Sequence, residues 1–288
     1  MRQPFTVIAG GVTAAAGRTG DAAAPVTWRV DLRTASAVGA GEISAWRALL
    51  VRAGVADPIH ADPDYLLPAA EHQAGGRELV FALAWADGSG HERLEAVVPL
   101  ALPHSLWGRG RIVVWQPFGT AVAPTIASGH EAAVREALVA RLGEARPRFA
   151  LDLVTEPTSR TTAPRLRAVA PRGGIPTHSL VGVRPVHAPS ATTIERISDP
   201  QRVPEAVEAF LALDAEVSAA PILGDPSAVA MVRRVTRLFA QRRQVTVALT
   251  RRAGAVVAAS VTLGNGAQAV LWHHAAREPV VPRVERSA

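Results

Sequence analysis

The sequence predicts an α/β fold of two successive modules, each with a twisted, mixed but largely antiparallel sheet flanked by helices. Segments with the alternating apolar pattern of strands are interspersed with segments at helical spacing. Two helices followed by three strands occur once before residue 118 and again after residue 204. A stretch rich in Pro, Gly, Ser and Thr, 158–192, separates the two halves, so we expect a connecting region there.

The first half begins with a strand and two helices. Residues 27–32 alternate as a strand does, and apolar side chains recur at helical spacing in 42–53. Asp62 followed by Pro63 is typical of an N-cap and a first helical position, because Asp accepts a hydrogen bond from an unpaired backbone N–H and Pro lacks that N–H. We therefore expect a second helix to about His72.

Three strands, another helix and a last strand complete the first half. The strands are expected at 78–86, 93–103 and 111–118, separated by glycine-containing turns. Ser128 and Glu131 have the spacing of a capping box, which predicts a helix after them. The apolar run at 149–157 predicts a buried strand.

The second half repeats most of this order. Helices are expected at 204–218 and 226–243, the latter opened by Asp225 in the manner of Asp62. Three strands then follow at 244–250, 256–263 and 267–274. The pattern stops there, so we expect the second module to be incomplete. The expected organisation is a flexible leader (1–25), a first module (26–157), a connecting region (158–192), a second module (193–276) and a tail (277–288).

Composition excludes several kinds of chemistry. All 31 basic residues are Arg, and Cys is absent. Without Lys, pyridoxal phosphate cannot be held as an internal Schiff base, and without Cys there is no thiolate nucleophile, disulfide or zinc-thiolate site. No segment reaches the roughly 18 continuous apolar residues of a membrane span. We therefore expect a cytoplasmic protein without a membrane span, and its net charge of +6 favours an anionic partner.

Several segments resemble the GNAT superfamily of acyl-CoA N-acyltransferases. They are WRALLVRAG, EAVVPLAL, FALDLVTEP, VEAFLALDAEVS and FAQRRQVTVALTRRAGAVVAASVTLGNGAQAVLWHHAA. The resemblance covers about residues 27–276 and is greatest to the CelD-like acetyltransferase family, named for cellulose biosynthesis; tandem modules are also typical of the Fem transferases. It implies transfer of an acyl group from acetyl-CoA or another acyl-CoA to an amine or hydroxyl of a small molecule, sugar or peptide precursor.

The chain departs from that family where CoA would bind. The Gly-rich loop after the fourth strand of a GNAT module, which offers backbone N–H groups to the pyrophosphate, is missing after both halves. The only tyrosine, Tyr65, is in a predicted helix outside the position of the usual tyrosine acid. An alternative is therefore a truncated or inactive GNAT-like protein that binds a partner without catalysis.

Three residues are candidate catalytic groups. His273 and His274 end the last predicted strand, where an imidazole near the cofactor could act as a base. Because neighbouring strand residues point to opposite faces, at most one of the two histidines can point into the cleft where the cofactor would bind. Asp214 is at a position where the resembling family carries an acidic residue near the acceptor. The structural alternatives are that the histidines are packed or surface residues and that Asp214 is a polar residue at the edge of its helix.

The arginine-rich helix supplies the candidate cofactor ligands. Arg233, Arg237 and Arg242 could pair with CoA phosphates, and no acidic residue occurs in 226–277. The alternatives are a solvated polar face of an amphipathic helix and, least favoured, a nucleic-acid surface. We expect no metal, because His60, Asp62 and Asp64 are an incomplete ligand set once Asp62 serves as the N-cap.

Overall fold

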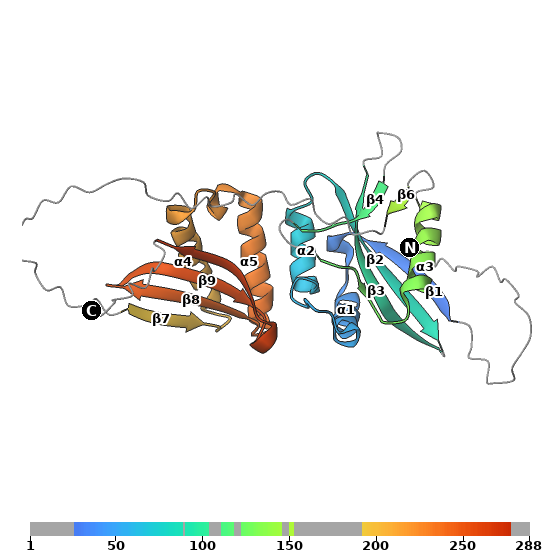
Figure 1. Cartoon of the computed structure of the whole chain (residues 1–288), viewed down its shortest axis with the longest axis horizontal. Helices are drawn as coiled ribbons and strands as arrows, with labels where there is room; N and C mark the ends of the chain where they lie inside the picture. The colour runs from blue at the N-terminus through green and yellow to red at the C-terminus, as the bar shows by residue number, and fades with distance from the viewer. Residues whose placement is uncertain are drawn as a thin grey trace, which may run out of the picture.

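The computed structural model describes residues 26–88, 90–103, 111–117, 122–145, 150–152 and 192–277 (Figure 1). The predicted fold class is confirmed, because a six-stranded and a four-stranded sheet follow one another along the chain, each flanked by helices. The expected leader, nearly all of the connecting region and tail, and the end of the strand predicted at 149–157 lie outside the described residues.

The first module contains the elements expected of it and, in addition, a short strand, β5, that was not predicted. They are β1 (Thr27–Arg33), a 3-10 turn (Ala35–Ala37), α1 (Ala40–Ala53), α2 (Pro63–His72), β2 (Glu78–Gly88), β3 (His91–Leu102), β4 (Arg111–Val114), β5 (Thr125–Ile126), α3 (Glu131–Ala145) and β6 (Ala150–Asp152). The sheet order is β1-β2-β3-β4-β6, and β5 also pairs with β3. Among the strands that the structure describes here, only the β4–β6 pair is parallel.

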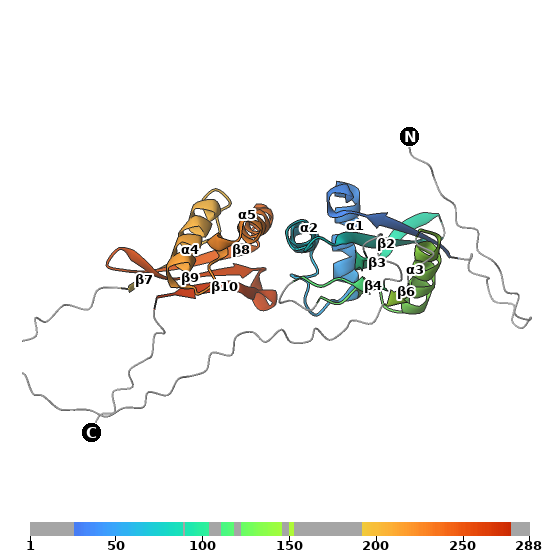
Figure 2. The ribbon, with the colours of Figure 1, turned by 90° about the horizontal axis from the view of Figure 1, so that it is seen from above.

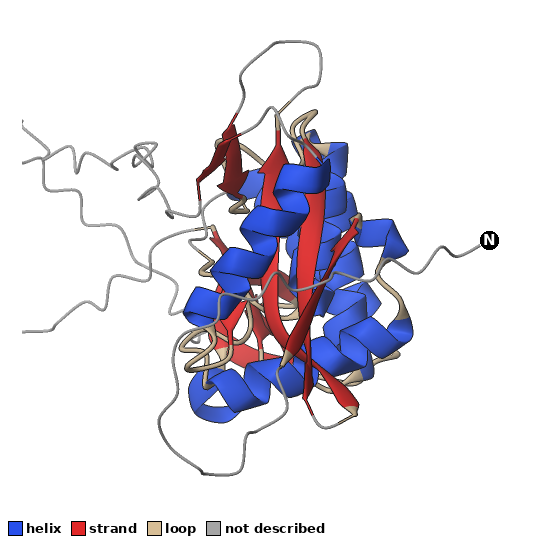
Figure 3. Ribbon diagram, turned by 90° about the vertical axis from the view of Figure 1, so that its right-hand side faces the viewer, coloured by secondary structure: helices blue, strands red, loops and turns tan. Residues whose placement is uncertain are grey.

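Helices cover both faces of this first sheet. Viewed from the end of the molecule, α3 lies in front of the strands and other helices lie behind them (Figure 3). One set of buried strand residues, including Val98 and Leu100, packs under Val134, Leu138 and Leu142 of α3. The strand residues that alternate with these point to the opposite face and pack under α1 and α2. The first module is therefore a three-layer unit.

The helix starts show which capping predictions hold. Asp62 caps α2 as expected, since its Oδ1 accepts a hydrogen bond from the Asp64 N–H at 2.8 Å. The prediction for α3 is wrong by two residues. The carbonyl of His130, rather than Ser128, accepts the first helical bond, from the Val134 N–H. Ser128 instead belongs to a turn whose Gly129 has a φ of +83°, which glycine adopts without strain.

The second module is a smaller unit. Its elements are β7 (Thr192–Ile197), α4 (Val203–Val217), a 3-10 turn (Ile222–Gly224), α5 (Pro226–Gln241), β8 (Val245–Arg252), β9 (Ala255–Leu263), a second 3-10 turn (Gly266–Gln268) and β10 (Val270–Ala276). The strands pair antiparallel in the order β10-β9-β8-β7. Strand β7 was not predicted, and β10 begins three residues later and ends two residues later than the strand predicted at 267–274.

Only one face of this second sheet is covered within the described part of the chain. Figure 2 shows α4 and α5 together on one side of the strands. Residues facing these helices, such as Val247 and Val261, are fully buried. The alternating residues, including Thr246, Ser260 and Thr262, are half-exposed. This difference between the two sheets affects where each module gains its stability.

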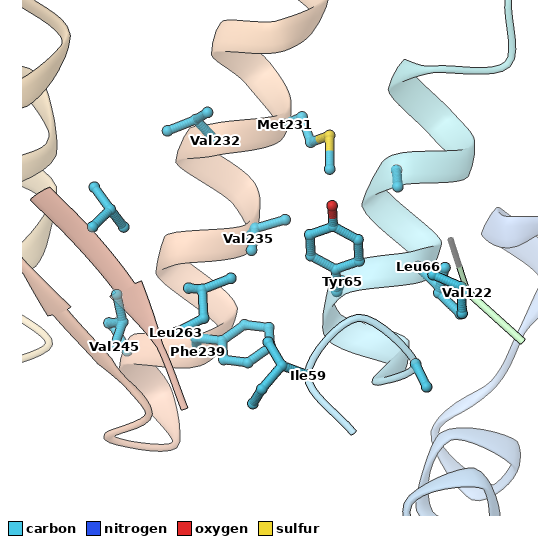
Figure 4. Close-up of a cluster of buried hydrophobic side chains, with 14 of the residues drawn as sticks. Ile59, Tyr65, Leu66, Val122, Met231, Val232, Val235, Phe239, Val245 and Leu263 are labelled. Carbon is cyan, nitrogen blue, oxygen red and sulfur yellow. The ribbon is translucent and has the colours of Figure 1, made fainter. Parts of the chain in front are cut away.

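The two modules meet where α2 lies beside α5. Figure 4 shows Tyr65 projecting from α2 toward α5, with its hydroxyl oxygen toward Met231 and Val235 near its ring. Buried side chains of both modules form a single apolar cluster across this seam. At Gly264, in the turn after β9, a Cβ atom would lie 2.6 Å from Ile59 Cδ1 of the first module. The seam is therefore closely packed.

Candidate functional site

The last strand of the second module is irregular near its middle. Strand β10 pairs with β9, and the register shifts between Leu271 and His273, so Trp272 is the extra residue of a β-bulge. In a bulge, the backbone groups of the extra residue leave the regular ladder. No strand within the described residues pairs with the other edge of β10. The bulge thus presents unpaired backbone groups at an open sheet edge.

His273 lies against α4 beside this bulge. Its ring centroid is 4.4 Å from that of Trp272 and 5.9 Å from that of Phe210. Burial lowers the pKa of His273 below the ordinary histidine value, and the negative charge of Asp214 opposes that effect. At neutral pH the imidazole is therefore neutral, which is the form that can accept a proton.

Asp214 occupies the C-terminal half of α4 and is buried. Its Oδ2 accepts a hydrogen bond from the Ile222 N–H at 2.7 Å, and its backbone carbonyl accepts one from the Ser218 N–H at 2.8 Å. The carboxylate thus fixes the turn that follows α4 and at the same time acts electrostatically on His273. The structure brings these two predicted residues into one region.

His274 is separated from that region by the alternation of the strand. It is exposed, whereas Ala275 next to it is buried. Of the two adjacent histidines, His273 alone contacts an aromatic ring of α4 in the described structure.

Tyr65 reaches this site from the other module, which sequence analysis did not anticipate. Its ring meets the Trp272 ring edge to face, with centroids 5.9 Å apart and planes at 73°. Its ring also meets His60 edge to face at 4.8 Å, and His60 Nδ1 lies 2.6 Å from Asp57 Oδ2. Tyr65 lies in a helix as predicted, but its contact with the last strand was not predicted. No local signal in the sequence could reveal a contact between these two modules.

Two of the three arginines predicted to bind CoA phosphates are paired with carboxylates. Arg233 makes a bidentate pair with Glu208, with Nε and Nη2 each 2.7 Å from an oxygen. Arg242 Nη1 lies 2.8 Å from Asp62 Oδ2 and 2.9 Å from Asp64 Oδ2. Arg237 is exposed and forms no ion pair within the described residues.

The Arg242 cluster is mostly buried and joins the two modules. The Asp62 and Asp64 side chains are 8% and 9% exposed, and Arg47 Nη2 also lies 2.7 Å from Asp64 Oδ2. Burial raises the pKa of Asp62, while its hydrogen bonds from Arg242 and from the Asp64 N–H oppose this rise. Asp62 and Asp64 of the apparent partial metal set therefore belong to an ion-pair cluster, whereas His60 is paired with Asp57. Among the residues described, no group of three or more His, Asp or Glu could hold a metal ion.

A cavity of about 330 Å³ lies in the first module beside the start of α3. It is lined by Val26, Ala86, Gly88, His91, Arg93, Glu95 and His130. Glu95 is 1% exposed, and its Oε1 accepts a hydrogen bond from Arg93 Nε. Its Oε2 has no hydrogen bond in the described structure but lies 3.6 Å from Arg52 Nη2. A buried carboxylate beside a helix N-terminus disfavours a phosphate there, although that terminus by itself favours anions.

Comparison with known proteins gives distant likenesses among solved structures. No protein-family model and no curated protein matches the sequence. Among solved structures, the chain is similar to a tandem GNAT protein from the clavulanic acid biosynthesis pathway, in a structure without AcCoA. The TM-score is 0.38 and the sequence identity 15%, over 87% of this chain and 79% of that one. Within the described residues, the helices are all too short or too polar to cross a membrane.

Proposed function

We propose that this protein is an acyltransferase of the GNAT type, which moves an acetyl or other acyl group from acyl-CoA to an amine or hydroxyl of a small-molecule, sugar or peptide-precursor acceptor. The observation that carries the proposal is the bulge of β10 beside the half-buried His273. A bulged fourth strand, an open strand edge and a neutral imidazole are what direct acyl transfer requires at one place.

The chemistry uses groups that are already present. A backbone N–H at Trp272 would donate to the thioester carbonyl oxygen and stabilise the negative charge that develops on it. The acceptor nitrogen would attack the carbonyl carbon, and the bond from that carbon to the CoA sulfur would break. His273 would take the proton that the acceptor nitrogen loses, and the CoA thiolate would leave. No covalent enzyme intermediate is needed, in agreement with the absence of Cys.

The order of elements supports the same assignment. Residues 26–157 and 193–276 are proposed as two GNAT-like modules. In the first, helix α3 connects β4 to its parallel partner β6, as the GNAT order requires. The finer assignment to the CelD-like family, with tandem modules as in Fem transferases, rests on the sequence segments alone. Arg237 is the proposed contact for a CoA phosphate, because Arg233 and Arg242 are engaged with carboxylates.

A second candidate function is binding without catalysis. It is favoured by the pairing of Arg242 with two aspartates and by the buried Glu95 in the first-module cavity, since both reduce the positive charge available to a pyrophosphate. In this case the chain would hold an acceptor or a partner protein but would not turn over acyl-CoA.

Titration of the full chain with acetyl-CoA tests the proposal. Isothermal calorimetry is expected to give a dissociation constant between about 1 μM and 1 mM, the usual range for enzyme substrates. Because the chain has no Cys, a thiol-reactive dye can follow CoA release from acetyl-CoA without background from the protein. A panel of amines, amino sugars and short peptides would serve as acceptors.

Two histidine variants give the matched comparison. His273→Gln is expected to lower CoA release at least about 100-fold, as loss of a general base does, and to leave acetyl-CoA binding unchanged. His274→Gln, at the exposed neighbouring position, should keep wild-type release. If millimolar acetyl-CoA produces no binding heat and no thermal shift, the acyltransferase proposal is refuted. Binding without CoA release for any acceptor would favour the second candidate.

A further inference from the structure

Trp272 contacts aromatic groups of both modules. The Tyr65 ring of α2 meets its ring edge to face, and the ring centroid of its neighbour His273 lies 4.4 Å from its own. Trp272 is also the extra residue of the bulge, so its side chain projects from the point where the strand backbone leaves the regular ladder. The contact from the first module is thus made at the irregular point of β10.

Tyr65 is well placed to hold this contact rigidly. It is 2% exposed and lies in the first turn of α2, whose N-cap Asp62 is bound to Arg242 of the second module. Just before that helix, Ile59 would lie 2.6 Å from a Cβ at Gly264, so the first module packs closely against the turn after β9. Edge-to-face aromatic pairs with centroids between about 4.5 and 7 Å apart are favourable beyond their buried area.

We propose that Tyr65 is a positioning residue for His273: through its edge-to-face contact with Trp272, the first module fixes the bulge of β10 and thereby the imidazole that follows it. This inference rests on the proposed function only for its consequence for catalysis. The contact itself is a property of the fold. It gives the first module a part in a site whose reacting groups belong to the second.

The charged groups around His273 identify what else could move its pKa. Asp214 of α4 acts on it directly. Arg277, just after β10, is paired with Glu216 of α4, and His274 lies exposed on the other side of the strand. Substitution of Tyr65 changes none of these charges. A change in the pKa of His273 in a Tyr65 variant would therefore report a change in position or burial of the ring.

The test is an NMR titration of the histidine side chains in the full ¹⁵N-labelled chain, with His273 assigned by His273→Gln. Tyr65→Leu removes the ring, so water gains access to Trp272 and the pKa of His273 is expected to rise toward the ordinary value. Tyr65→Phe keeps the ring and should leave that pKa unchanged. Phe239→Leu removes another buried ring of the seam and serves as the control for general destabilisation.

The outcomes distinguish a positioning role of Tyr65 from a general effect on the stability of the protein. A folded Tyr65→Leu protein with the wild-type His273 pKa would overturn the inference, as would an equal change in Phe239→Leu. If Tyr65→Leu does not fold, Trp272→Phe at the half-exposed strand edge replaces it. The pKa of His273 is again expected to rise, and an unchanged pKa in the folded variant would again overturn the inference.

The pKa measurement needs no acyl-CoA, so failure of the proposed activity does not affect it. If the protein does release CoA from acetyl-CoA, Tyr65→Leu should slow that release about tenfold with little change in KM, because misplacement of a catalytic group by a fraction of an ångström has effects of this size. Tyr65→Phe should retain the wild-type rate. Loss of activity in both variants alike would contradict a role of the ring.

Discussion

In each module a pair of helices covers one face of the sheet, but the modules differ in what covers the opposite face. In the first, α1 and α2 cover one face and α3 covers the opposite one, which creates a second buried cluster. In the second, α4 and α5 cover one face, and the opposite face carries half-exposed Thr, Ser and Ala in the described part of the chain. The second module therefore relies on one core, and that core is shared with the first module across the α2–α5 seam.

The comparison shows why the site depends on the seam. A two-layer unit with an open strand edge buries less apolar surface than a three-layer unit, and stability grows with the area buried. Contacts from the first module compensate by fixing α5 and the turn after β9. The part of the molecule with the candidate chemistry is thus the part that is least able to hold its shape alone.

The largest effect is expected from Arg242→Leu, which leaves Asp62 and Asp64 buried at the seam without their shared cation. Loss of one partner of a buried ion pair typically costs about 3 kcal/mol or more in the free energy of unfolding. Urea denaturation would measure it, with Arg237→Leu on the same helix as the control. Equal stability of the two variants would show that the seam does not depend on this cluster.

The same variant has a pH signature with a definite sign. Burial already raises the pKa of Asp62, and removal of Arg242 takes away a hydrogen bond that lowers it. In the variant, the folded state therefore binds a proton more readily than the unfolded state, so its stability relative to wild type improves as the pH falls from neutral toward 4. If the loss of unfolding free energy relative to wild type stays constant over this pH range, the buried carboxylate is not its cause.

A smaller effect contrasts the two sheet faces. Val98 is 1% exposed and packs under α3, so Val98→Ala is expected to cost about 2 kcal/mol. Thr262 lies on the uncovered face of the second sheet, and Thr262→Ala should change the free energy of unfolding by no more than about 0.5 kcal/mol. Thermal or urea unfolding measures both. A cost for Thr262→Ala equal to that for Val98→Ala would mean that something covers the second sheet.

A difference of about 1 kcal/mol is expected between two glycine variants, because both carry the strain of a positive φ but only one meets a packed neighbour. Gly264 has a φ of +85° and a Cβ there would clash with Ile59, whereas Gly254 has a φ of +80° and open space around it. Gly264→Ala should thus be less stable than Gly254→Ala. Addition of Ile59→Ala should reduce the difference, and a difference that persists in that background would exclude the contact as its cause.

The smallest effect is the contribution of His273 to the pH dependence of stability. Because its folded-state pKa is lowered by burial, the unfolded chain takes up a proton first as the pH falls. The stability contributed is complete above about pH 6.5, the ordinary histidine value, and decreases below it. His273→Gln should flatten this part of the profile, and His274→Gln should not. If His274→Gln flattens the profile and His273→Gln does not, His273 is exposed to solvent rather than buried.

Much of the fold could be predicted from the sequence, because its signals act over a few residues. Alternating and helical periodicity located nearly all of the helices and strands described here, and Asp62 and Asp225 cap their helices as expected. Strand β7 was missed because TTIERI is mostly exposed and shows little alternation of burial. The capping box at Ser128 failed because a turn at Gly129 separates that residue from the helix.

The candidate site could be predicted only in part. Asp214 and His273 were named from resemblance and position, and the structure brings them to one region. The bulge at Trp272 could not be foreseen, because its register is set by pairing with β9 rather than by its own residues. Neither could the contact from Tyr65, for which no periodic or capping signal exists.

The sequence by itself determined the α/β class, the repeated order of elements and, through the absence of Lys and Cys, the exclusion of Schiff-base and thiolate chemistry. Only the tertiary structure decided which arginines have acidic partners and that Tyr65 of the first module contacts the last strand. The physical reason is distance along the chain. Helix and strand patterns arise from neighbours a few residues apart, whereas Arg242 and Asp62 are 180 residues apart and meet only when both modules have folded.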